Sequence, residues 1–315
     1  MSLNRPTEFQ SLDDLLNATY CDILENGILI SDSKRGANIE IIQFAATLLS
    51  PRVRTSMSLD RKLVQSKFAE FAWYLSKDED KDFIKPYIKD YDKEENQNNK
   101  IIGAYGSKIF GSIEGRKSQY ETVIEQIEKR GTTKQAYIAI SDSENYKFRA
   151  EQFASPPCTI GLHFYVRQAK LNLTVYMRSN DAYLGLPHDL FCFTMLQELV
   201  SLRTNTPLGL YTHCATSMHI YETHQQKIKD YLNEGFQEPI EMPSMVDSSN
   251  EMLDLVSREF NPKENISNLP HLNDYWRDYS LFSNKHSSRS KSRESWKQLF
   301  NNECMRLIAT NSIAQ

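Results

Sequence analysis

Apolar residues recur at helical spacing in two segments of the chain. Residues 63–76 (LVQSKFAEFAWYLS) and 119–130 (QYETVIEQIEKR) both place apolar side chains three and four positions apart. In an α-helix such positions share one face, so each segment is predicted to form an amphipathic helix. Gly131 follows the second segment and predicts where that helix ends. The apolar positions are Val64, Phe68, Phe71, Ala72 and Leu75 in the first segment, and Tyr120, Val123, Ile124 and Ile127 in the second.

The middle of the chain changes to a strand pattern. Two runs rich in β-branched and aromatic residues, 159–166 (TIGLHFYV) and 171–177 (LNLTVYM), flank the tetrapeptide RQAK and predict a β-hairpin. Residues 186–203 are mostly apolar and carry Pro187 near their start, which predicts a buried helix. Residues 211–224 then return as a predicted strand. Because strands and helices do not alternate strictly, the pattern favours an α+β or mixed α/β sheet.

Composition excludes several classes of protein. The chain has 315 residues, 40% of them hydrophobic, and a formal net charge of −4. This balance argues against nucleic-acid binding, which draws its affinity from a strong basic excess. The N-terminal residues lack the apolar centre of a signal peptide, and no apolar run approaches the ~18 residues that span a bilayer. We therefore expect partners other than nucleic acid or a membrane.

Cysteine usage indicates the compartment. The five cysteines are widely spaced and include no Cys-x-x-Cys pair, which fits neither a zinc site nor a disulfide framework. We therefore expect no bound metal, a reducing environment and a cytoplasmic location. The cysteines are Cys21, Cys158, Cys192, Cys214 and Cys304.

Polar residues embedded in the apolar segments are the candidates for chemistry. Cys158 follows two prolines where an extended loop should become a strand, so its thiol is expected at an edge. Taken singly, each such residue also has a structural explanation. A cysteine can be a small apolar residue, a carboxylate can lie on a solvated helix face or near a helix N-terminus, and a histidine can be a hydrogen-bonded core residue. These alternatives apply to Cys158, Glu70, Asp189 and His219.

The order and spacing of these residues say more than each residue alone. The chain contains, in this order, the segments PPC, FYV, KLNLTVYMRSNDAYLGLPHDL and HIY. They resemble the thymidylate synthase superfamily, whose members show the same succession of Pro-Cys, a hairpin, Arg-Ser-x-Asp, Leu-Gly-x-Pro and His-x-Tyr. Upstream, AEFAWYL resembles the family helix with its glutamate at Glu70, IIGAYGSKI its Tyr-Gly segment at Tyr105, and SDSKRGAN its phosphate loop at Arg35. The resemblance implies a three-layer α/β (α+β) fold with a large mixed β-sheet, and a homodimer packed sheet against sheet.

The resemblance implies covalent chemistry on a pyrimidine nucleoside monophosphate. Cys158 is expected to add to ring carbon C6, which makes C5 able to attack the one-carbon unit of 5,10-methylenetetrahydrofolate. Arg178 is expected to favour the thiolate and, with Ser179 and Arg35, to bind the phosphate. Lys134 is expected to reach the phosphate held by the partner subunit.

The remaining matched residues are expected to complete the site. Glu70 would shuttle protons through ordered water, and His219 and Tyr221 would bind the sugar hydroxyl. Tyr105 would contact the substrate, while Asp181 and Gly185 would belong to the folate site, with Asp181 holding the pterin.

Asp189 is the most informative departure from the family. Thymidylate synthases carry Asn at this position, whose amide donates to uracil O4 and accepts from N3–H. A carboxylate has no donor for O4, but it can accept from the amino group of cytosine and share a proton with N3. Cytidylate hydroxymethylases of the superfamily carry Asp here. Asp189 therefore favours CMP or dCMP as substrate, and a 5-hydroxymethyl product.

Other departures lie around the phosphate and hydride-transfer chemistry. The family's paired arginines, its His after the nucleophile, its Gln before Arg-Ser and its Gly-Asp before His-x-Tyr are all replaced. The residues at these positions are Lys134 and Gln135, Thr159, Met177, and Thr216 and Ser217. Two alternatives to a hydroxymethylase therefore stay open: a thymidylate synthase that methylates dUMP, and a nucleotide-binding relative without catalytic activity.

The resemblance also suggests a division of the chain. It covers residues from about 27 to about 245, so residues 1–245 are expected to form the catalytic domain. Residues 246–315 match no part of the family and are expected to form a C-terminal extension, packed on or appended to that domain.

Overall fold

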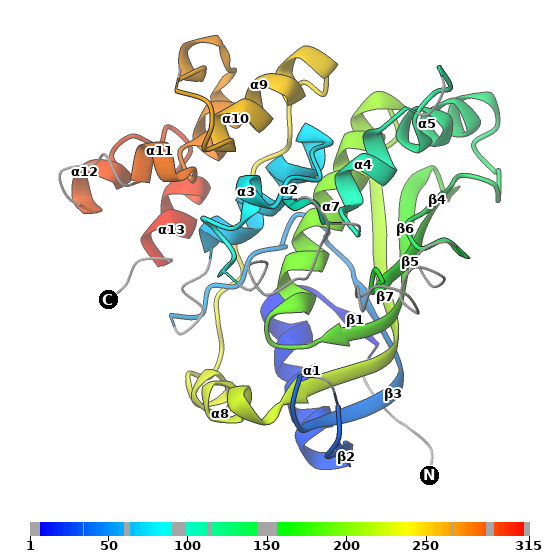
Figure 1. The fold of residues 1–315 in the computed structure, drawn as a ribbon, viewed down its shortest axis with the longest axis vertical. Coiled ribbons are helices and arrows are strands. Elements are labelled where there is room, and N and C mark those ends of the chain that lie inside the picture. The colour runs from blue at the N-terminus through cyan, green and yellow to red at the C-terminus, as the bar shows by residue number, and fades with distance from the viewer. Residues whose placement is uncertain are drawn as a thin grey trace.

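A mixed β-sheet forms the centre of the protein. The computed structural model describes residues 7–33, 35–59, 64–89, 99–101, 103–112, 115–143, 156–265, 267–287 and 293–311. Within these ranges seven strands form one sheet in the order β1-β3-β7-β6-β5-β4, with β2 paired to β3 (Figure 1). The strands are β1 (Glu8–Phe9), β2 (Ile28–Ile30), β3 (Asn38–Leu48), β4 (Tyr137–Ala139), β5 (Thr159–Arg167), β6 (Lys170–Asp181) and β7 (Leu208–Tyr221).

The predicted hairpin is confirmed as β5 and β6. The two strands are antiparallel, and Gln168 and Ala169 connect them with φ angles of 53° and 57°. Two successive residues with positive φ are typical of the type I′ turn, whose twist matches that of paired strands. β7 runs parallel to β6, so the chain must cross over between them, and helix α7 (Gly185–Arg203) makes this connection.

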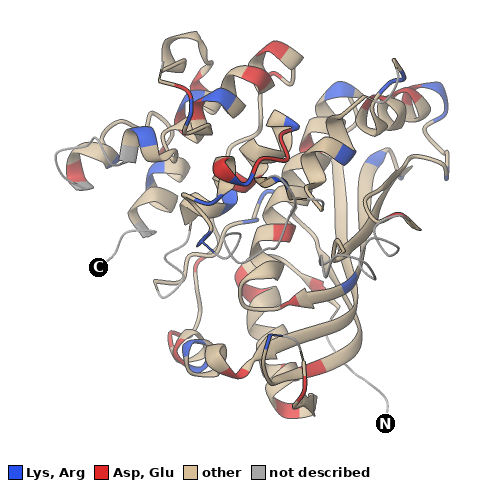
Figure 2. Cartoon of the chain, viewed as in Figure 1, with Lys and Arg blue, Asp and Glu red and all other residues tan. Residues whose placement is uncertain are grey.

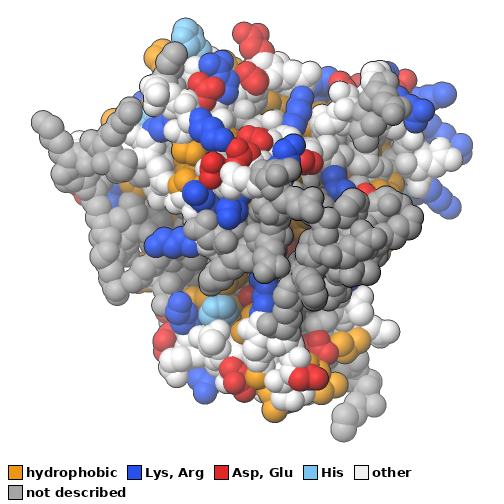
Figure 3. Space-filling model, viewed as in Figure 1, with side chains coloured by type: hydrophobic (Ala, Val, Ile, Leu, Met, Phe, Trp, Pro, Cys, Tyr) orange, Lys and Arg blue, Asp and Glu red, His pale blue; other side chains and the backbone are white. Residues whose placement is uncertain are grey.

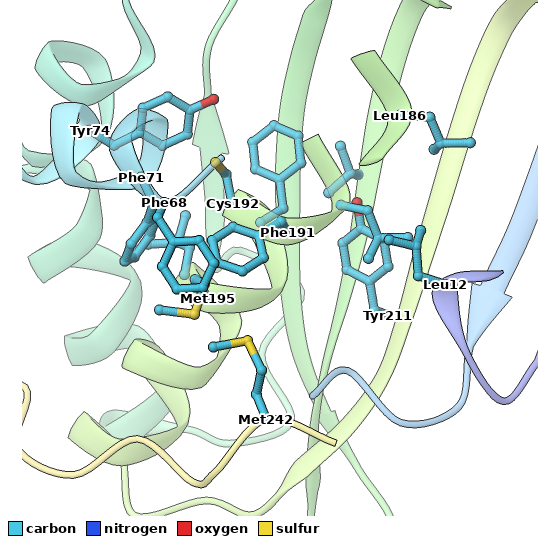
Figure 4. Packing of buried hydrophobic residues seen from close by; sticks show 14 of the residues in the cluster. Leu12, Phe68, Phe71, Tyr74, Leu186, Phe191, Cys192, Met195, Tyr211 and Met242 are labelled. Atoms are coloured by element: carbon cyan, nitrogen blue, oxygen red, sulfur yellow. The ribbon is translucent and has the colours of Figure 1, made fainter. Parts of the chain in front are cut away.

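Helices α1 (Leu12–Asn26) and α7 cover one face of the sheet, and α2 (Val64–Ser76) packs outside α7 (Figure 1). Figure 4 shows Leu12 of α1 beside Tyr211 of β7, and Phe68 of α2 meeting Phe191 of α7, where the ring centroids are 4.8 Å apart. These four side chains are fully buried. The sheet, the first helical layer and the outer helices thus form the mixed three-layer arrangement that the resemblance implies.

The helices predicted from apolar spacing are confirmed. They are α2, α5 (Gln119–Lys129) and α7. A capping box explains the start of α5, because Ser118 and Glu121 each bond the other's backbone N–H. The predicted strand over residues 211–224 is wrong at its end. β7 stops at Tyr221, and Glu222–His224 form a 3-10 turn of polar residues that continue no apolar alternation.

Residues beyond 246 add helices that pack against α2. The hydroxyl of Tyr279 donates to the carbonyl oxygen of Phe68 at 2.7 Å, and the ring of Phe282 stacks on that of Phe68 at 4.0 Å. Among the described residues, no helix is both long enough and apolar enough to cross a membrane. The remaining helices are α3 (Lys81–Ile84), α4 (Tyr105–Phe110), α8 (Gln225–Asn233), α9 (Asn250–Phe260), α10 (Asp274–Ser280), α11 (Asn284–Ser287), α12 (Arg293–Lys297) and α13 (Glu303–Asn311).

The opposite face of the sheet stays partly open. A row of cross-strand neighbours runs over five strands on this face, and its side chains are only partly buried or exposed. Tyr176 on the same face is 41% exposed. The long strands of the sheet carry few charged residues (Figure 2). We call this surface the open sheet face; its central row is Tyr137, His163, Thr174, Thr212 and Thr47.

Candidate active site

Cys158 lies immediately before β5, and Arg178 fixes the main chain around it. The backbone N–H of Arg178 donates to the carbonyl oxygen of Cys158 at 2.9 Å. The guanidinium of Arg178 donates to the carbonyl oxygens of Pro156 at 2.7 Å and Pro157 at 3.1 Å. The hairpin register explains this contact, because Thr159 lies opposite the residue before Arg178. Cys158 is a partly buried residue.

Tyr105 connects Cys158 with Asp189. Its hydroxyl accepts a hydrogen bond from the backbone N–H of Thr159 at 3.3 Å, next to Cys158. Its ring lies nearly parallel to that of Phe193 on α7, with centroids 6.2 Å apart. Burial raises the pKa of the Tyr105 phenol well above its usual value, and the charges of Asp189 and Cys158 raise it further. Tyr105 is therefore within electrostatic reach of both residues.

Asp189 is a partly exposed carboxyl with a perturbed proton affinity. It is the fifth residue of α7, beyond the first turn, so a simple helix-terminal role does not explain it. The side-chain amide of Asn180 donates to Oδ2 of Asp189 at 2.7 Å. Burial raises the pKa of Asp189 to about 7, the bond from Asn180 opposes this rise, and the charge of Asp181 adds to it. Asp189 can therefore exchange a proton near neutral pH.

His219, Tyr221, Ser179 and Arg35 lie together at the ends of β6 and β7. The Ser179 hydroxyl is 3.5 Å from Nδ1 of His219, and the rings of His219 and Tyr221 meet edge to face at 4.9 Å. Burial lowers the pKa of His219. The charges of Asp181 and Glu40 oppose this decrease, and the positive charge of Arg35 adds to it. The charge of Arg35 also acts on the Tyr221 phenol, whose pKa is raised mainly by burial. The structure thus brings these four residues into one cluster.

Asp181 has one carboxyl oxygen directed away from its own turn. Its Oδ1 accepts from the backbone N–H groups of Tyr183 at 2.8 Å and Leu184 at 3.1 Å. Its Oδ2 is 4.0 Å from Nδ1 of His224. The turn therefore does not use Oδ2, which can accept a hydrogen bond from a donor outside the turn. Within the described residues, no three His, Cys, Asp or Glu side chains are grouped to hold a metal ion.

Gly185 lies against the hydrogen bond between Asn180 and Asp189. A Cβ atom at position 185 would be 2.8 Å from the amide nitrogen of Asn180 and 3.6 Å from Oδ2 of Asp189. Any larger residue would therefore push the amide away from the carboxyl. This gives Gly185 a structural reason that the sequence pattern alone does not reveal.

Glu70 is a buried carboxyl on α2. Its residue is only 7% exposed, so the alternative of a solvated helix position is wrong. The hydroxyl of Tyr74, one turn later, donates to Glu70 at 3.4 Å. Burial raises the pKa of the Cys192 thiol, and the charges of Glu70 and Asp189 both add to this rise. Glu70 and Asp189 therefore act on the same region of α7.

Lys134 lies apart from the residues around Cys158 and Asp189. It is exposed between α5 and β4, where its carbonyl oxygen is 3.2 Å from Nε2 of His163. No described contact joins Lys134 to Cys158 or Asp189. Basic side chains gather at the end of the molecule that carries α5 (Figure 3), and Lys129 and Arg130 precede Lys134 closely in the chain. Within one chain, Lys134 is therefore no part of the cluster around Cys158.

Three polar residues near Asp189 are not predicted by the sequence analysis. They are Asn180, which donates to Asp189, and His213 and Tyr211, which continue the hydrogen bonding behind it. Tyr211 and His213 occupy alternate positions of a strand, so both point to the same face. Their polar atoms on the buried face of an apolar strand are the signal that could have identified them.

The fold agrees with comparisons to known proteins. A family model described as thymidylate synthase matches residues 18–268. This range covers most of the chain, which therefore belongs to the thymidylate synthase family. The match extends past residue 245, where the sequence analysis places the end of the catalytic domain.

Individual relatives carry the same name. A thymidylate synthase of Staphylococcus haemolyticus is 28% identical over 149 residues, which is 46% of this chain and 46% of the relative. One from Mycoplasma mobile is 33% identical over 95 residues, 30% of this chain and 32% of the relative. The chain thus matches less than half the length of these relatives. The solved structure of thermostable thymidylate synthase A from Bacillus subtilis superposes with a TM-score of 0.61 at 21% identity, covering 76% of this chain and 91% of that one.

Proposed function

We propose that the protein is a pyrimidine nucleotide C5-hydroxymethyltransferase. It converts CMP or dCMP to the 5-hydroxymethyl nucleotide with 5,10-methylenetetrahydrofolate, through a bond between the Cys158 sulfur and ring carbon C6. The observation that carries the proposal is the presence of a partly buried Cys158 and of an Asp189 carboxyl whose pKa is raised to about 7, both of which act electrostatically on the Tyr105 phenol.

Asp189 supports cytosine over uracil. In its neutral form, Oδ1–H can donate to N3 of cytosine while the other oxygen accepts from the 4-amino group. The amide of Asn180 already donates to Oδ2, which favours Oδ1 as the site of the proton. Uracil presents O4 and N3–H, so the same carboxyl would face an acceptor and a donor in the wrong order. A polar mismatch in a buried site can lower kcat/KM by roughly 10⁴-fold.

Cys158 supplies the nucleophile in this mechanism. As a thiolate it adds to C6, and C5 becomes electron-rich enough to form a bond to carbon. Arg178 holds the peptide that carries the thiol and keeps further N–H donors for the nucleotide phosphate, since only two of its five side-chain N–H groups meet the proline carbonyls. Ser179 and Arg35 belong to the same cluster and would complete the phosphate contacts.

The remaining residues position the sugar and move protons. His219 and Tyr221 offer a ring nitrogen and a phenol to the sugar hydroxyl, and Asp181 offers Oδ2 to the pterin. Methylenetetrahydrofolate supplies the one-carbon unit when bound. Glu70 would take the C5 proton through water while the bond between the one-carbon unit and tetrahydrofolate breaks, so that tetrahydrofolate is the leaving group. A water then adds to the exocyclic carbon as the Cys158–C6 bond breaks, so the nucleotide gains CH₂O overall.

Mass spectrometry of the nucleotide product tests this proposal. We expect CMP or dCMP, incubated with the protein and methylenetetrahydrofolate, to gain the mass of CH₂O. The folate product should be tetrahydrofolate, because no hydride leaves it. Conversion of dUMP with the mass gain of CH₂, together with dihydrofolate, would contradict the proposal and establish the methylating alternative.

The names of the matched relatives identify the family and do not separate that alternative from a hydroxymethylase. Each is called a thymidylate synthase. A third outcome, in which none of the three nucleotides changes mass although nucleotide binds, would indicate a relative without catalytic activity. The assay with CMP, dCMP and dUMP side by side separates all three functions.

We also propose that two copies associate through the open sheet face. The face combines exposed Tyr137 and Tyr176 with a row of threonines, an uncharged surface of the kind that homodimers bury. Lys134 lies beside this face and apart from Cys158 of its own chain. In the dimer it would reach the phosphate bound by the partner.

Tyr176→Arg is expected to convert the dimer to a monomer, because it places a charge inside the paired sheets. Leu202→Arg changes a residue of similar exposure on α7 and should leave the dimer intact. Light scattering after size-exclusion chromatography measures both masses. A monomeric wild-type protein, or an unchanged mass for Tyr176→Arg, would refute this interface.

A further inference from the structure

A line of hydrogen bonds leads from the protein interior to Asp189. The Tyr211 hydroxyl is 2.9 Å from Nδ1 of His213, and Nε2 of His213 is 3.0 Å from Oδ1 of Asn180. The amide nitrogen of Asn180 is 2.7 Å from Oδ2 of Asp189. Three elements contribute: β7 carries Tyr211 and His213, β6 carries Asn180, and α7 carries Asp189.

Donor and acceptor chemistry gives this line one direction. Because Oδ1 of Asn180 can only accept, Nε2 of His213 must carry the hydrogen. Nδ1 of His213 is then the acceptor for the Tyr211 hydroxyl. The amide nitrogen of Asn180 can only donate, so Asp189 receives a donor at Oδ2. Every bond points toward Asp189, and bonds aligned in this way polarise and strengthen one another.

The residues behind Asp189 are locked in the core. Tyr211 and His213 have no exposed surface, and Asn180 is 4% exposed. Burial lowers the pKa of His213 to about 3, so its ring stays neutral and its two nitrogens keep distinct roles. Gly185 leaves the space in which the Asn180 amide reaches the carboxyl.

The titratable groups facing Asp189 come from every element packed around it. Asp181 raises the pKa of Asp189, and the other groups are phenols and a thiol whose own pKa values burial raises, with Asp189 adding to each rise. They are Asp181 from β6, Tyr74 from α2, Tyr105 from α4, Tyr211 from β7 and Cys192 from α7.

We propose that Asn180, His213 and Tyr211 are positioning residues that hold the Asp189 carboxyl and set its proton affinity. The line places one donor on Oδ2, which keeps a second lone pair for the ligand, and leaves Oδ1 to carry the proton that meets the ligand. The effect of these residues on base selectivity rests on the proposed function, whereas their effect on the proton affinity of Asp189 does not. Base selectivity would then depend on residues that never touch the nucleotide.

Titration of Asp189 in the ligand-free protein tests the proposal. Carbon NMR of protein labelled at the aspartate carboxyl carbons reports its midpoint, with the signal identified by its loss in Asp189→Asn. Asn180→Leu removes the donor at similar volume and should raise the midpoint by on the order of one pH unit, tenfold in proton affinity. Tyr211→Phe weakens the far end of the line and should raise the midpoint by less.

Tyr275→Phe is the matched control. It also removes a buried tyrosine hydroxyl, one that contacts the sulfur of Met195 at 3.7 Å, and should leave the Asp189 midpoint unchanged. If Asn180→Leu fails to fold, Tyr211→Phe alone decides the matter, since it deletes only one oxygen. Midpoints that stay at the wild-type value in the folded variants would overturn the proposal.

The outcome is separable from that of the proposed function. A protein that methylates dUMP but shows the shifted midpoints would disprove the hydroxymethylase and keep the positioning line. A protein that hydroxymethylates cytidylate but shows unshifted midpoints would keep the enzyme and disprove the line.

Discussion

Cys158→Ser is expected to abolish turnover of every nucleotide while nucleotide affinity changes by less than about tenfold, or roughly 1.4 kcal/mol. The reason is that a serine hydroxyl stays protonated at neutral pH and is a far poorer nucleophile than a thiolate. The loss should therefore appear in kcat, by at least about 10⁴-fold, with KM little changed. Product formation followed by mass spectrometry, and binding followed by calorimetry, measure the two effects separately.

Cys21→Ser provides the matched control for this variant. Cys21 is a similarly half-buried thiol, on α1 and outside the cluster around Cys158. Its replacement should leave both turnover and affinity unchanged. Measurable hydroxymethylation or methylation by Cys158→Ser would exclude the covalent role and leave Cys158 as a small residue of the core edge.

Asp189→Asn is expected to exchange the base preference. The amide of the new side chain can donate to uracil O4 and accept from N3–H, whereas cytosine would face it with the wrong pattern. The ratio of kcat/KM for cytidylate to that for uridylate should fall by at least about 10²-fold. Asp254→Asn removes the same charge at an exposed position of α9 and should leave the ratio unchanged. An Asp189→Asn variant with the wild-type preference would remove the main argument for cytosine.

The pH dependence gives a second readout of Asp189. Its pKa is raised to about 7, so the neutral acid, which is the form proposed to pair with cytosine, predominates below this pH and the carboxylate above it. In the wild-type protein, kcat/KM for cytidylate should fall as the pH rises through about 7, because this constant reports the free enzyme. The Asn side chain does not titrate, so the variant should lack this limb.

The elements that the sequence predicts well are those with local periodicity. Helices α2, α5 and α7 and the hairpin of β5 and β6 each repeat an apolar pattern over several turns or residues. The pattern does not define β3, because its apolar and polar residues do not alternate regularly and its backbone is irregular at Gln43, where φ is 58°. The helices after residue 246 are also difficult to predict. Most are short, and they are held by aromatic contacts with α2 that are distant in the sequence.

The same distinction applies to the site. The neighbourhood of Cys158 and Arg178 follows from the register of one hairpin, so the sequence predicts it. The contact between Asn180 and Asp189 depends on how α7 lies over β6, and the contact between Asn180 and His213 depends on how β6 and β7 pair. No spacing in a single segment encodes either contact. Sequence patterns therefore identify the residues that can touch the nucleotide better than those that stand behind them.

The hydrogen bonds from Arg178 to the carbonyl oxygens of Pro156 and Pro157 have a consequence for substrate selection. Arg178 holds the segment that carries the Cys158 sulfur and, in the proposed function, would also bind the phosphate of the nucleotide. A nucleoside without a phosphate would reach Cys158 while Arg178 has no anion to bind. Phosphate binding and the position of the Cys158 sulfur would thus both depend on Arg178. On this basis the protein would discriminate against unphosphorylated pyrimidine nucleosides.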